Sequence, residues 1–500
     1  MAIEMPHTGQ GQELKPRLPR KFPRRKLLAA AGAAAAAGAA YGIEKTFGIQ
    51  IPGIARDGNG EPDSINNPDG SGDGNQQIGA DVTPTETATS IPNASLEGFP
   101  GVPIPDQDLI QSFLEPYSKT MGLSKENIQI SYRKYKDYLG KDFIVGVDTL
   151  TNAPLILADE NQENWVWQEA TLGKLGKKRG ISVGSFSGGT NATDQDFQNI
   201  LKVRQKEFNL GAIYQDMTMI ENVEGKYNLN ILRSIARMNA SSGFDFVVHP
   251  ILWWNAIPEW AKAKSRDELI GVIKDYTAII AKESGVGNPK PILVVVNEAG
   301  ETAYGQSLDK FQDIIGSEYV DIAFQAAREA NPNAILVYND NNNESINGKG
   351  INFLPAGNRY RTCKEIVDRL KTKGLIDGVG IQLHMDGSNP SDPDDVAKTM
   401  VSYSVPVYIT EFDINMRNVQ GNQIDKLTKQ AQMYEATTKG IISSGVCRAI
   451  INFQVGDKFS VWENYPGFGY SKTADPTLYD DDLNPKPALY AERRAFLLID

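Results

Sequence analysis

The segment Val294-Val-Val-Asn-Glu-Ala299 is a run of apolar, strand-forming residues that ends in a carboxylate, Glu298. The segment Val407-Tyr-Ile-Thr-Glu-Phe-Asp413 repeats this pattern and ends in Glu411 and Asp413. An acid at the end of a buried strand is costly to desolvate unless a partner compensates it. Two such acids at one edge of a parallel sheet are what the cleavage of a glycosidic bond requires. The simpler alternative, that each acid only caps a neighbouring helix, is much weaker for the pair than for either segment alone.

Short apolar runs alternate with amphipathic stretches from about residue 170 to the end of the chain. The eight runs begin at Ile181, Gly211, Phe244, Pro291, Ala334, Gly378, Val405 and Arg448. Because the runs are continuous rather than alternating, we expect strands buried on both faces, as in a parallel sheet covered by helices. Eight strand–helix units predict an α/β fold, a (β/α)8 TIM barrel, over residues 170–500.

Polar residues follow the predicted strands at their carboxyl ends, where barrels of this type carry their chemistry. Two of the three histidines of the chain lie at this edge, which favours a functional over a structural role for them. The residues at the strand ends are Tyr214, Gln215, His249, Asn297, Glu298, Asn339, Asp340, Gln382, His384, Glu411 and Asp413.

These motifs together resemble glycoside hydrolase family 10, the retaining endo-1,4-β-xylanase family of clan A, over about residues 170–500. Val295-Val-Asn-Glu-Ala299 is similar to the acid/base motif of the family, and Ile409-Thr-Glu-Phe-Asp413 to its nucleophile motif. The similarity extends to His249-x-x-x-Trp253, Tyr338-Asn-Asp340, Gly380-Ile-Gln-Leu-His384 and Asn484-Pro-Lys-Pro487.

The resemblance implies that Glu411 is the nucleophile and that Glu298 is the general acid and then the general base. Retention of configuration needs about 5–5.5 Å between the two carboxyl groups. His384 should hydrogen-bond Glu411 and favour its charged form. Asn297 should bind the sugar 2-hydroxyl group. Further residues expected to bind or support the substrate are Tyr214, Gln215, His249, Trp253, Trp254, Gln382, Asp413, Phe453 and Trp462.

Aromatic residues at this edge are expected to line an open cleft and to stack on sugar faces. They are Trp253, Trp254, Trp260, Phe453 and Trp462, although packing within the barrel is a serious alternative for Trp253 and Trp260.

Departures from the family pattern are concentrated where the family binds the glycone sugar beyond the reacting one. Tyr214 and Gln215 stand in place of a Glu-Asn pair, Trp254 in place of a second histidine, and Phe453 in place of a tryptophan. The resemblance therefore implies retained chemistry with an altered outer glycone subsite. Three hypotheses stay open: a xylanase, a clan A hydrolase for another β-glycan, and a non-catalytic carbohydrate-binding barrel.

The net charge of −11 hides a basic N-terminus, since residues 1–26 hold seven Lys and Arg against two Glu. The acidic remainder argues against nucleic acid as a partner, whereas a neutral polysaccharide is indifferent to charge. The two cysteines, Cys363 and Cys447, cannot build a disulfide framework, and whether they pair is open. No residue pattern indicates a metal or a cofactor, and we expect a monomer.

The N-terminus has the features of an export signal, with Arg24 and Arg25 ahead of an alanine-rich apolar run. We predict a twin-arginine-like signal at residues 1–45, a disordered polar linker at 46–98 and a small extension at 99–169 that packs on the barrel. An alanine-rich surface helix is the alternative for the apolar run. The expected location is outside the cell, either secreted or tethered to the outer face of the membrane.

Overall fold

The structure, a computed structural model, describes residues 107–137, 142–151, 153–157, 170–188, 192–288, 290–303, 306–347, 359–464 and 474–499. The predicted export signal at 1–45 and linker at 46–98 lie outside these residues, as does part of the predicted extension.

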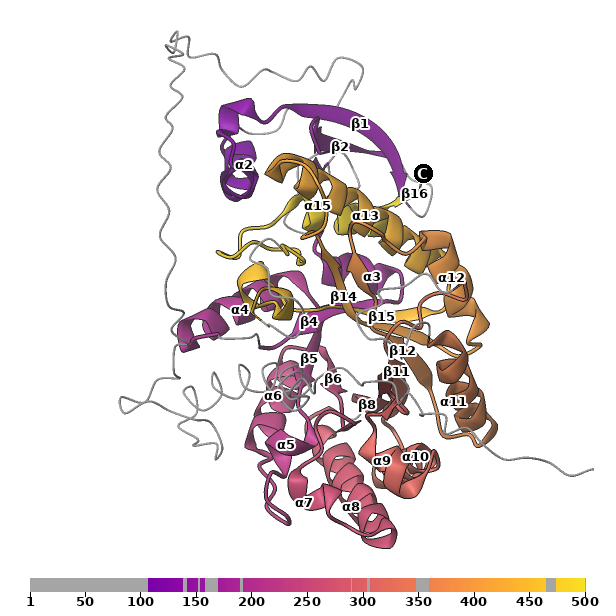
Figure 1. Ribbon diagram of the computed structural model, residues 1–500. Helices are drawn as coiled ribbons and strands as arrows, with labels where there is room; N and C mark the ends of the chain where they lie inside the picture. The colour runs from indigo at the N-terminus through magenta and orange to yellow at the C-terminus, as the bar shows by residue number, and fades with distance from the viewer. Residues whose placement is uncertain are drawn as a thin grey trace, which may run out of the picture.

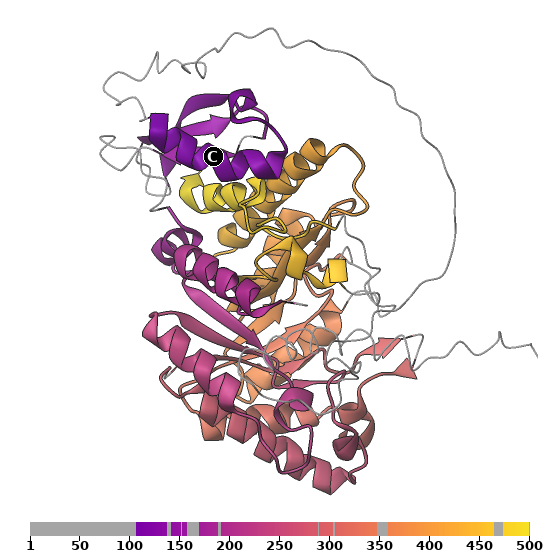
Figure 2. The same cartoon turned by 90° about the vertical axis from the view of Figure 1, so that its left-hand side faces the viewer.

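Eight parallel strands close into a barrel, which confirms the predicted fold (Figures 1 and 2). Each strand pairs with the next in chain order, and the last strand, β15, pairs with the first, β4. All eight apolar runs of the sequence form strands of this barrel. The strands are β4 (Ser182–Phe186), β5 (Leu210–Tyr214), β6 (Asp245–His249), β8 (Ile292–Asn297), β11 (Ile335–Asp340), β12 (Gly378–Ile381), β14 (Val407–Asn415) and β15 (Cys447–Asn452).

Helices surround the barrel, and two short strands extend it at the carboxyl end, β7 (Leu252–Trp253) beside β8 and β13 (His384–Asp386) beside β14. The helices are α3 (Leu172–Lys178), α4 (Asp194–Glu207), α5 (Met217–Ile220), α6 (Asn230–Ser241), α7 (Glu259–Lys262), α8 (Arg266–Ser284), α9 (Lys310–Ile315), α10 (Tyr319–Ala330), α11 (Tyr360–Thr372), α12 (Pro393–Ser402), α13 (Gln423–Ser443), α14 (Val461–Asn464) and α15 (Pro487–Leu497). Shorter elements are the hairpin of β9 (Thr302–Ala303) and β10 (Gln306–Ser307) and the 3-10 turn η2 (Asp457–Phe459).

Local sequence signals set where several of these helices begin. Thr193, Ser265 and Asn422 each precede a helix and form a capping box with an acid three residues later, which satisfies backbone N–H groups that have no partner within the helix. These boxes start α4, α8 and α13, so the strand-to-helix turns are fixed by short-range hydrogen bonds.

The apolar core has two layers, as the continuous apolar strands require. Inside the barrel, side chains such as Phe186, Val294 and Tyr408 fill the centre. A larger layer between strands and helices includes Val295 and Ile409, the alternate residues of the same strands. Burial on both faces leaves the strand ends as the place where polar side chains can meet.

An N-terminal unit lies against the C-terminal end of the chain (Figures 1 and 2). It consists of α2 (Gln107–Met121), the 3-10 turn η1 (Lys125–Asn127), β1 (Ile130–Asp137), β2 (Asp142–Asp148) and β3 (Pro154–Leu157). Its antiparallel sheet is completed by the last strand of the chain, β16 (Leu498–Ile499), which pairs with β1. The ring of Tyr117 in α2 packs edge-on against Tyr490 in α15, with the centroids 5.6 Å apart.

Cys363 and Cys447 are both buried and unpaired, so no disulfide joins them. No helix in the described ranges combines the length and the apolar character needed to cross a membrane.

Candidate active site

Glu298 follows β8 directly, and its carboxyl group is held by three donors. The indole nitrogens of Trp253 and Trp254 donate to Oε2 at 2.7 and 2.9 Å, and the Gln382 amide donates to Oε1 at 2.6 Å. The backbone of Glu298 has a φ of 56°, a left-handed conformation that residues with a side chain rarely adopt. Its N–H donates to the carbonyl of Asn339 at 2.9 Å, which ties the end of β8 to β11.

Glu411 lies within β14, and two histidines and an amide surround its carboxylate. His249 Nε2 lies 3.2 Å from Oε1, His384 Nε2 lies 3.2 Å from Oε2, and Asn339 donates to Oε1 at 3.2 Å. Burial alone would raise the pKa of this carboxyl group, but the charges and hydrogen bonds of His249 and His384 lower it to about 2. Glu411 is therefore an ionised carboxylate, as attack on an anomeric carbon requires.

Three amide side chains link the two carboxylates. Asn339 donates to Asn297 Oδ1 at 2.8 Å as well as to Glu411, and Gln382 donates to Glu298 and, at 3.4 Å, to the same Asn297 oxygen. The hydroxyl of Thr410 fixes the Asn339 amide from the other side, at 2.7 Å. The bonds from Asn339 and Gln382 both use Asn297 Oδ1, and Nδ2 is the group of this amide that can donate to a ligand hydroxyl.

His384 is held between two carboxylates. Its Nδ1 lies 2.9 Å from Asp413 Oδ1, and its Nε2 faces Glu411. Burial lowers the pKa of this imidazole, but the charges of Asp413 and Glu411 outweigh it and raise the value to about 10. Ionised carboxylates only accept hydrogen bonds, so the charged form of this ring, which carries a proton on both nitrogens, suits these two partners.

Trp462 does not line an open cleft, contrary to the expectation from the sequence. It is fully buried, its indole donates to Asp413 Oδ2 at 2.6 Å, and its ring packs edge-on against His384. Its role in this structure is to support the histidine. Trp260 follows the packing alternative rather than the cleft, because its indole donates to the Glu221 carbonyl and its ring packs against the core.

Tyr214, Trp253 and Trp254 form an aromatic wall beside Glu298. Tyr214 packs edge-on against Trp253, and Trp253 against Trp254, with centroids 6.3 and 6.1 Å apart. Trp254 is only 9% exposed, and Phe453 packs edge-on against His384. The hydroxyl of Tyr214 donates to Asp216 at 2.8 Å.

Gln215 is buried beside this wall, and its Oε1 has no hydrogen-bond partner among the described residues. The structure thus brings all the predicted site residues to one end of the barrel, with Trp462 beneath the site rather than at its surface.

Sequence reasoning missed two buried charged residues, Glu301 and Arg359, which lie behind the Glu298 turn. Arg359 pairs with Asp340 and contacts Glu301. A buried acid at a strand end, Asp340, implies a compensating partner, but nothing in the sequence shows which residue that is.

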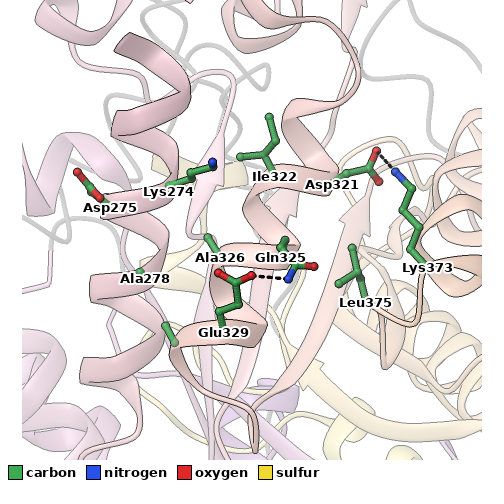
Figure 3. Close-up of a pocket in the computed structure, with 11 residues that line it drawn as sticks. Lys274, Asp275, Ala278, Asp321, Ile322, Gln325, Ala326, Glu329, Lys373 and Leu375 are labelled. Carbon is green, nitrogen blue, oxygen red and sulfur yellow. Dashed lines mark hydrogen bonds and ion pairs between the residues drawn. The ribbon is translucent and has the colours of Figure 1, made fainter. Parts of the chain in front are cut away.

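No group of three or more His, Cys, Asp or Glu side chains in the described part of the chain could hold a metal ion. A groove on the outside of the barrel, between α8 and α10, is lined by Ala278, Ile322, Ala326 and several charged residues (Figure 3). Two of its charged residues, Lys373 and Asp321, form an ion pair at 3.2 Å. The groove contains none of the strand-end residues.

Comparisons by sequence and by structure both find xylanases among the proteins similar to this chain. Residues 171–495 match the family described as glycosyl hydrolase family 10. The chain is 30% identical to endo-1,4-beta-xylanase B of Thermotoga neapolitana over 337 residues, which cover 65% of this chain and 91% of that protein. It is 28% identical to endo-1,4-beta-xylanase 5 of Pyricularia oryzae, with coverages of 63% and 76%. Native xylanase 10B of Thermotoga maritima aligns in structure with a TM-score of 0.57 and 25% identity, covering 65% of this chain and 98% of that one.

Proposed function

The chain belongs to glycoside hydrolase family 10, and from this membership we propose that it is a retaining endo-β-1,4-xylanase that cuts xylan with Glu411 and Glu298. The observation that carries the proposal is the contrast between the two acids. One amide network joins them, yet Glu411 faces a histidine cation whereas Glu298 faces neutral indole and amide donors. Two carboxyl groups in different surroundings can take different roles.

In the first step Glu411 attacks the anomeric carbon while the bond to the leaving oxygen breaks. Glu298 transfers its proton to that oxygen, and a covalent glycosyl-enzyme forms. In the second step water attacks the same carbon, Glu298 takes a proton from the water, and Glu411 leaves. Asn297 Nδ2 donates to the 2-hydroxyl group of the sugar, a contact that strengthens as positive charge develops on the ring.

The substrate and the mechanism are tested together on the full chain. We expect release of xylo-oligosaccharides from xylan, and no such release by Glu411→Ala. Azide should restore turnover of an activated aryl glycoside by Glu411→Ala and yield the α-glycosyl azide, since the anion replaces the missing nucleophile. A β-glycosyl azide from this variant would contradict the assignment of Glu411.

A second candidate is a hydrolase for another β-glycan. Tyr214, Gln215 and Trp254 favour it, because they depart from the family pattern, and Tyr214 and Trp254 belong with Trp253 to the aromatic wall beside Glu298. Products from mannan or glucan alone would support this candidate. Binding to a glycan measured by calorimetry, without release of product, would instead indicate a non-catalytic barrel.

Export is part of the proposal, with the basic and apolar residues 1–45 as signal and 46–98 as a tether. A polymer must be cut where it is, outside the cell. Fractionation of the producing cells tests this directly, and enzyme found only in the cytoplasm would contradict it.

A further inference from the structure

Ala299 follows the proposed acid/base Glu298, and both of its backbone polar groups are hydrogen-bonded to side chains. The N–H of Ala299 donates to the Tyr338 hydroxyl at 3.2 Å, and its carbonyl accepts from Arg359 Nη2 at 2.7 Å. Ala299 is itself buried, so an unpaired N–H or carbonyl at this residue would be costly. Together with the bond from the Glu298 N–H to the Asn339 carbonyl, these bonds hold three of the four backbone polar groups of Glu298 and Ala299.

The two groups that hold Ala299 are themselves joined through Asp340. Arg359 forms a fork with this carboxylate, Nε to Oδ1 at 2.6 Å and Nη2 to Oδ2 at 3.0 Å, and the Tyr338 hydroxyl donates to Oδ2 at 2.8 Å. Tyr338 and Asp340 lie on β11, whereas Arg359 immediately precedes α11. We call these three residues, Tyr338, Asp340 and Arg359, the clamp.

A second acid lies on the far side of the arginine. Glu301 Oε2 lies 3.6 Å from Arg359 Nη1 and accepts from Asn341 at 3.0 Å. Glu301 and Asp340 are both fully buried, and Arg359 is almost so. One buried cation therefore faces two buried acids.

A buried cluster of this kind is poorly explained as a source of stability. Taking charges out of water costs about as much as their attraction returns, and apolar replacements are often equally stable. Its position offers another explanation. Glu298 has a left-handed φ of 56°, which costs free energy and persists only where the surroundings impose it. The clamp acts on the next residue, where it fixes both ends of Ala299.

We propose that Arg359, acting with Asp340 and Tyr338, is a positioning residue for the acid/base Glu298. The clamp holds the backbone so that the Glu298 carboxyl group points at the leaving oxygen. Arg359 touches neither the substrate nor the reacting atoms. This inference rests on the proposed function, in which Glu298 gives its proton to the leaving group.

The loss of activity expected from disturbing the clamp depends on the leaving group of the substrate. A misplaced acid slows the cleavage of substrates whose leaving oxygen needs a proton, and it has little effect where the leaving group departs as a stable anion. We expect Tyr338→Phe and Arg359→Lys to reduce kcat/KM for xylan and for aryl xylobiosides with basic leaving groups by about tenfold or more. The loss for 2,4-dinitrophenyl xylobioside should stay within about threefold, because this leaving group needs little acid assistance.

Two features of these variants keep the test specific. Arg359→Lys retains the charge but loses the planar fork and the reach to the Ala299 carbonyl. Tyr338→Phe removes a single hydroxyl group from a buried ring. Tyr117→Phe is the matched control, because Tyr117 is also fully buried and its hydroxyl also donates to a buried acid, Asp148, at 2.8 Å, but in the N-terminal unit.

The experiment measures kcat/KM over a series of aryl xylobiosides of increasing leaving-group pKa, with thermal unfolding of each variant alongside. A steeper dependence on leaving-group pKa in the clamp variants, and an unchanged slope in Tyr117→Phe, would support the proposal. A uniform loss across the series, or no loss, would overturn it and leave the clamp a structural feature only. Wild-type protein that hydrolyses none of the series would instead refute the proposed function.

Discussion

His384 is expected to stay charged well into the alkaline range, and this charge should be visible as pH-dependent stability. Its pKa is about 10 in the folded protein, against 6.5 for an unperturbed imidazole, because Asp413 and Glu411 flank it. A group whose pKa is raised by folding contributes its full stabilisation at pH values below its pKa in the unfolded chain. That contribution is lost as the pH rises through its pKa in the folded protein.

The size of the effect follows from the two pKa values. Once the unfolded chain has released its proton, each further pH unit removes about 1.4 kcal/mol. Between pH 6 and pH 9 the contribution of His384 to the free energy of unfolding should fall by about 3 kcal/mol. At pH 9 most of the folded molecules still carry the proton.

The assay compares wild type with His384→Asn, which cannot be charged. Thermal or denaturant unfolding at several pH values should show the wild type more stable at pH 6 and the difference shrinking toward pH 9. The chain has only three histidines, so ¹³C-histidine NMR can follow the ring directly, and the signal lost in His384→Asn identifies it. Parallel stability profiles for the two proteins, or a His384 signal that titrates near 6.5, would refute the reasoning.

Three further substitutions test other parts of the structure. Trp462→Phe removes the indole that donates to Asp413. This should lower the free energy of unfolding by about 1–3 kcal/mol and weaken the support of His384. An unchanged free energy of unfolding would show that the contact is dispensable. Trp254→His should open space beside Glu298 and raise kcat/KM for longer xylo-oligosaccharides relative to xylobiosides, as measured by product analysis. If the ratio of these two kcat/KM values does not change, Trp254 does not limit the outer subsite. Arg493→Met leaves the buried acid Glu207 without its cation and should destabilise the fold by about 3–5 kcal/mol, seen as a lower unfolding temperature; per folded molecule, the activity should not change.

The barrel and the positions of its two acids could be predicted because both depend on local sequence. Val294 to Val296 are buried on both faces, and Glu298 comes directly after this apolar run, at the carboxyl end of β8. The same holds for Glu411, which follows Val407 to Thr410 in β14. Strand ends in a parallel barrel converge, so no long-range information was needed to bring the acids to one edge.

The clamp and the burial of Trp462 could not be predicted in the same way. The partner of Asp340 is Arg359, and sequence does not reveal which of many cations folding will deliver to a buried acid. An aromatic side chain can stack on a ligand or donate from within the core, and only the packing around Asp413 decides for Trp462. Trp254 was expected beside the active site, but its hydrogen bond to Glu298 depends on the position of a neighbouring turn.

The pairing of β1 with β16 has a consequence for the order of events during synthesis. Lys136 pairs with Ile499, so 363 residues of translation separate the two partners. At about 5–20 residues per second, the N-terminal sheet waits roughly 20 to 70 seconds for its last strand. β16 covers only the end of β1, at Lys136 and Asp137, and among the described residues no other strand pairs with this edge. Arg133 and Lys134 on β1 are the kind of charged residues that discourage edge-to-edge association, and this edge needs them in the folded protein as well as during synthesis.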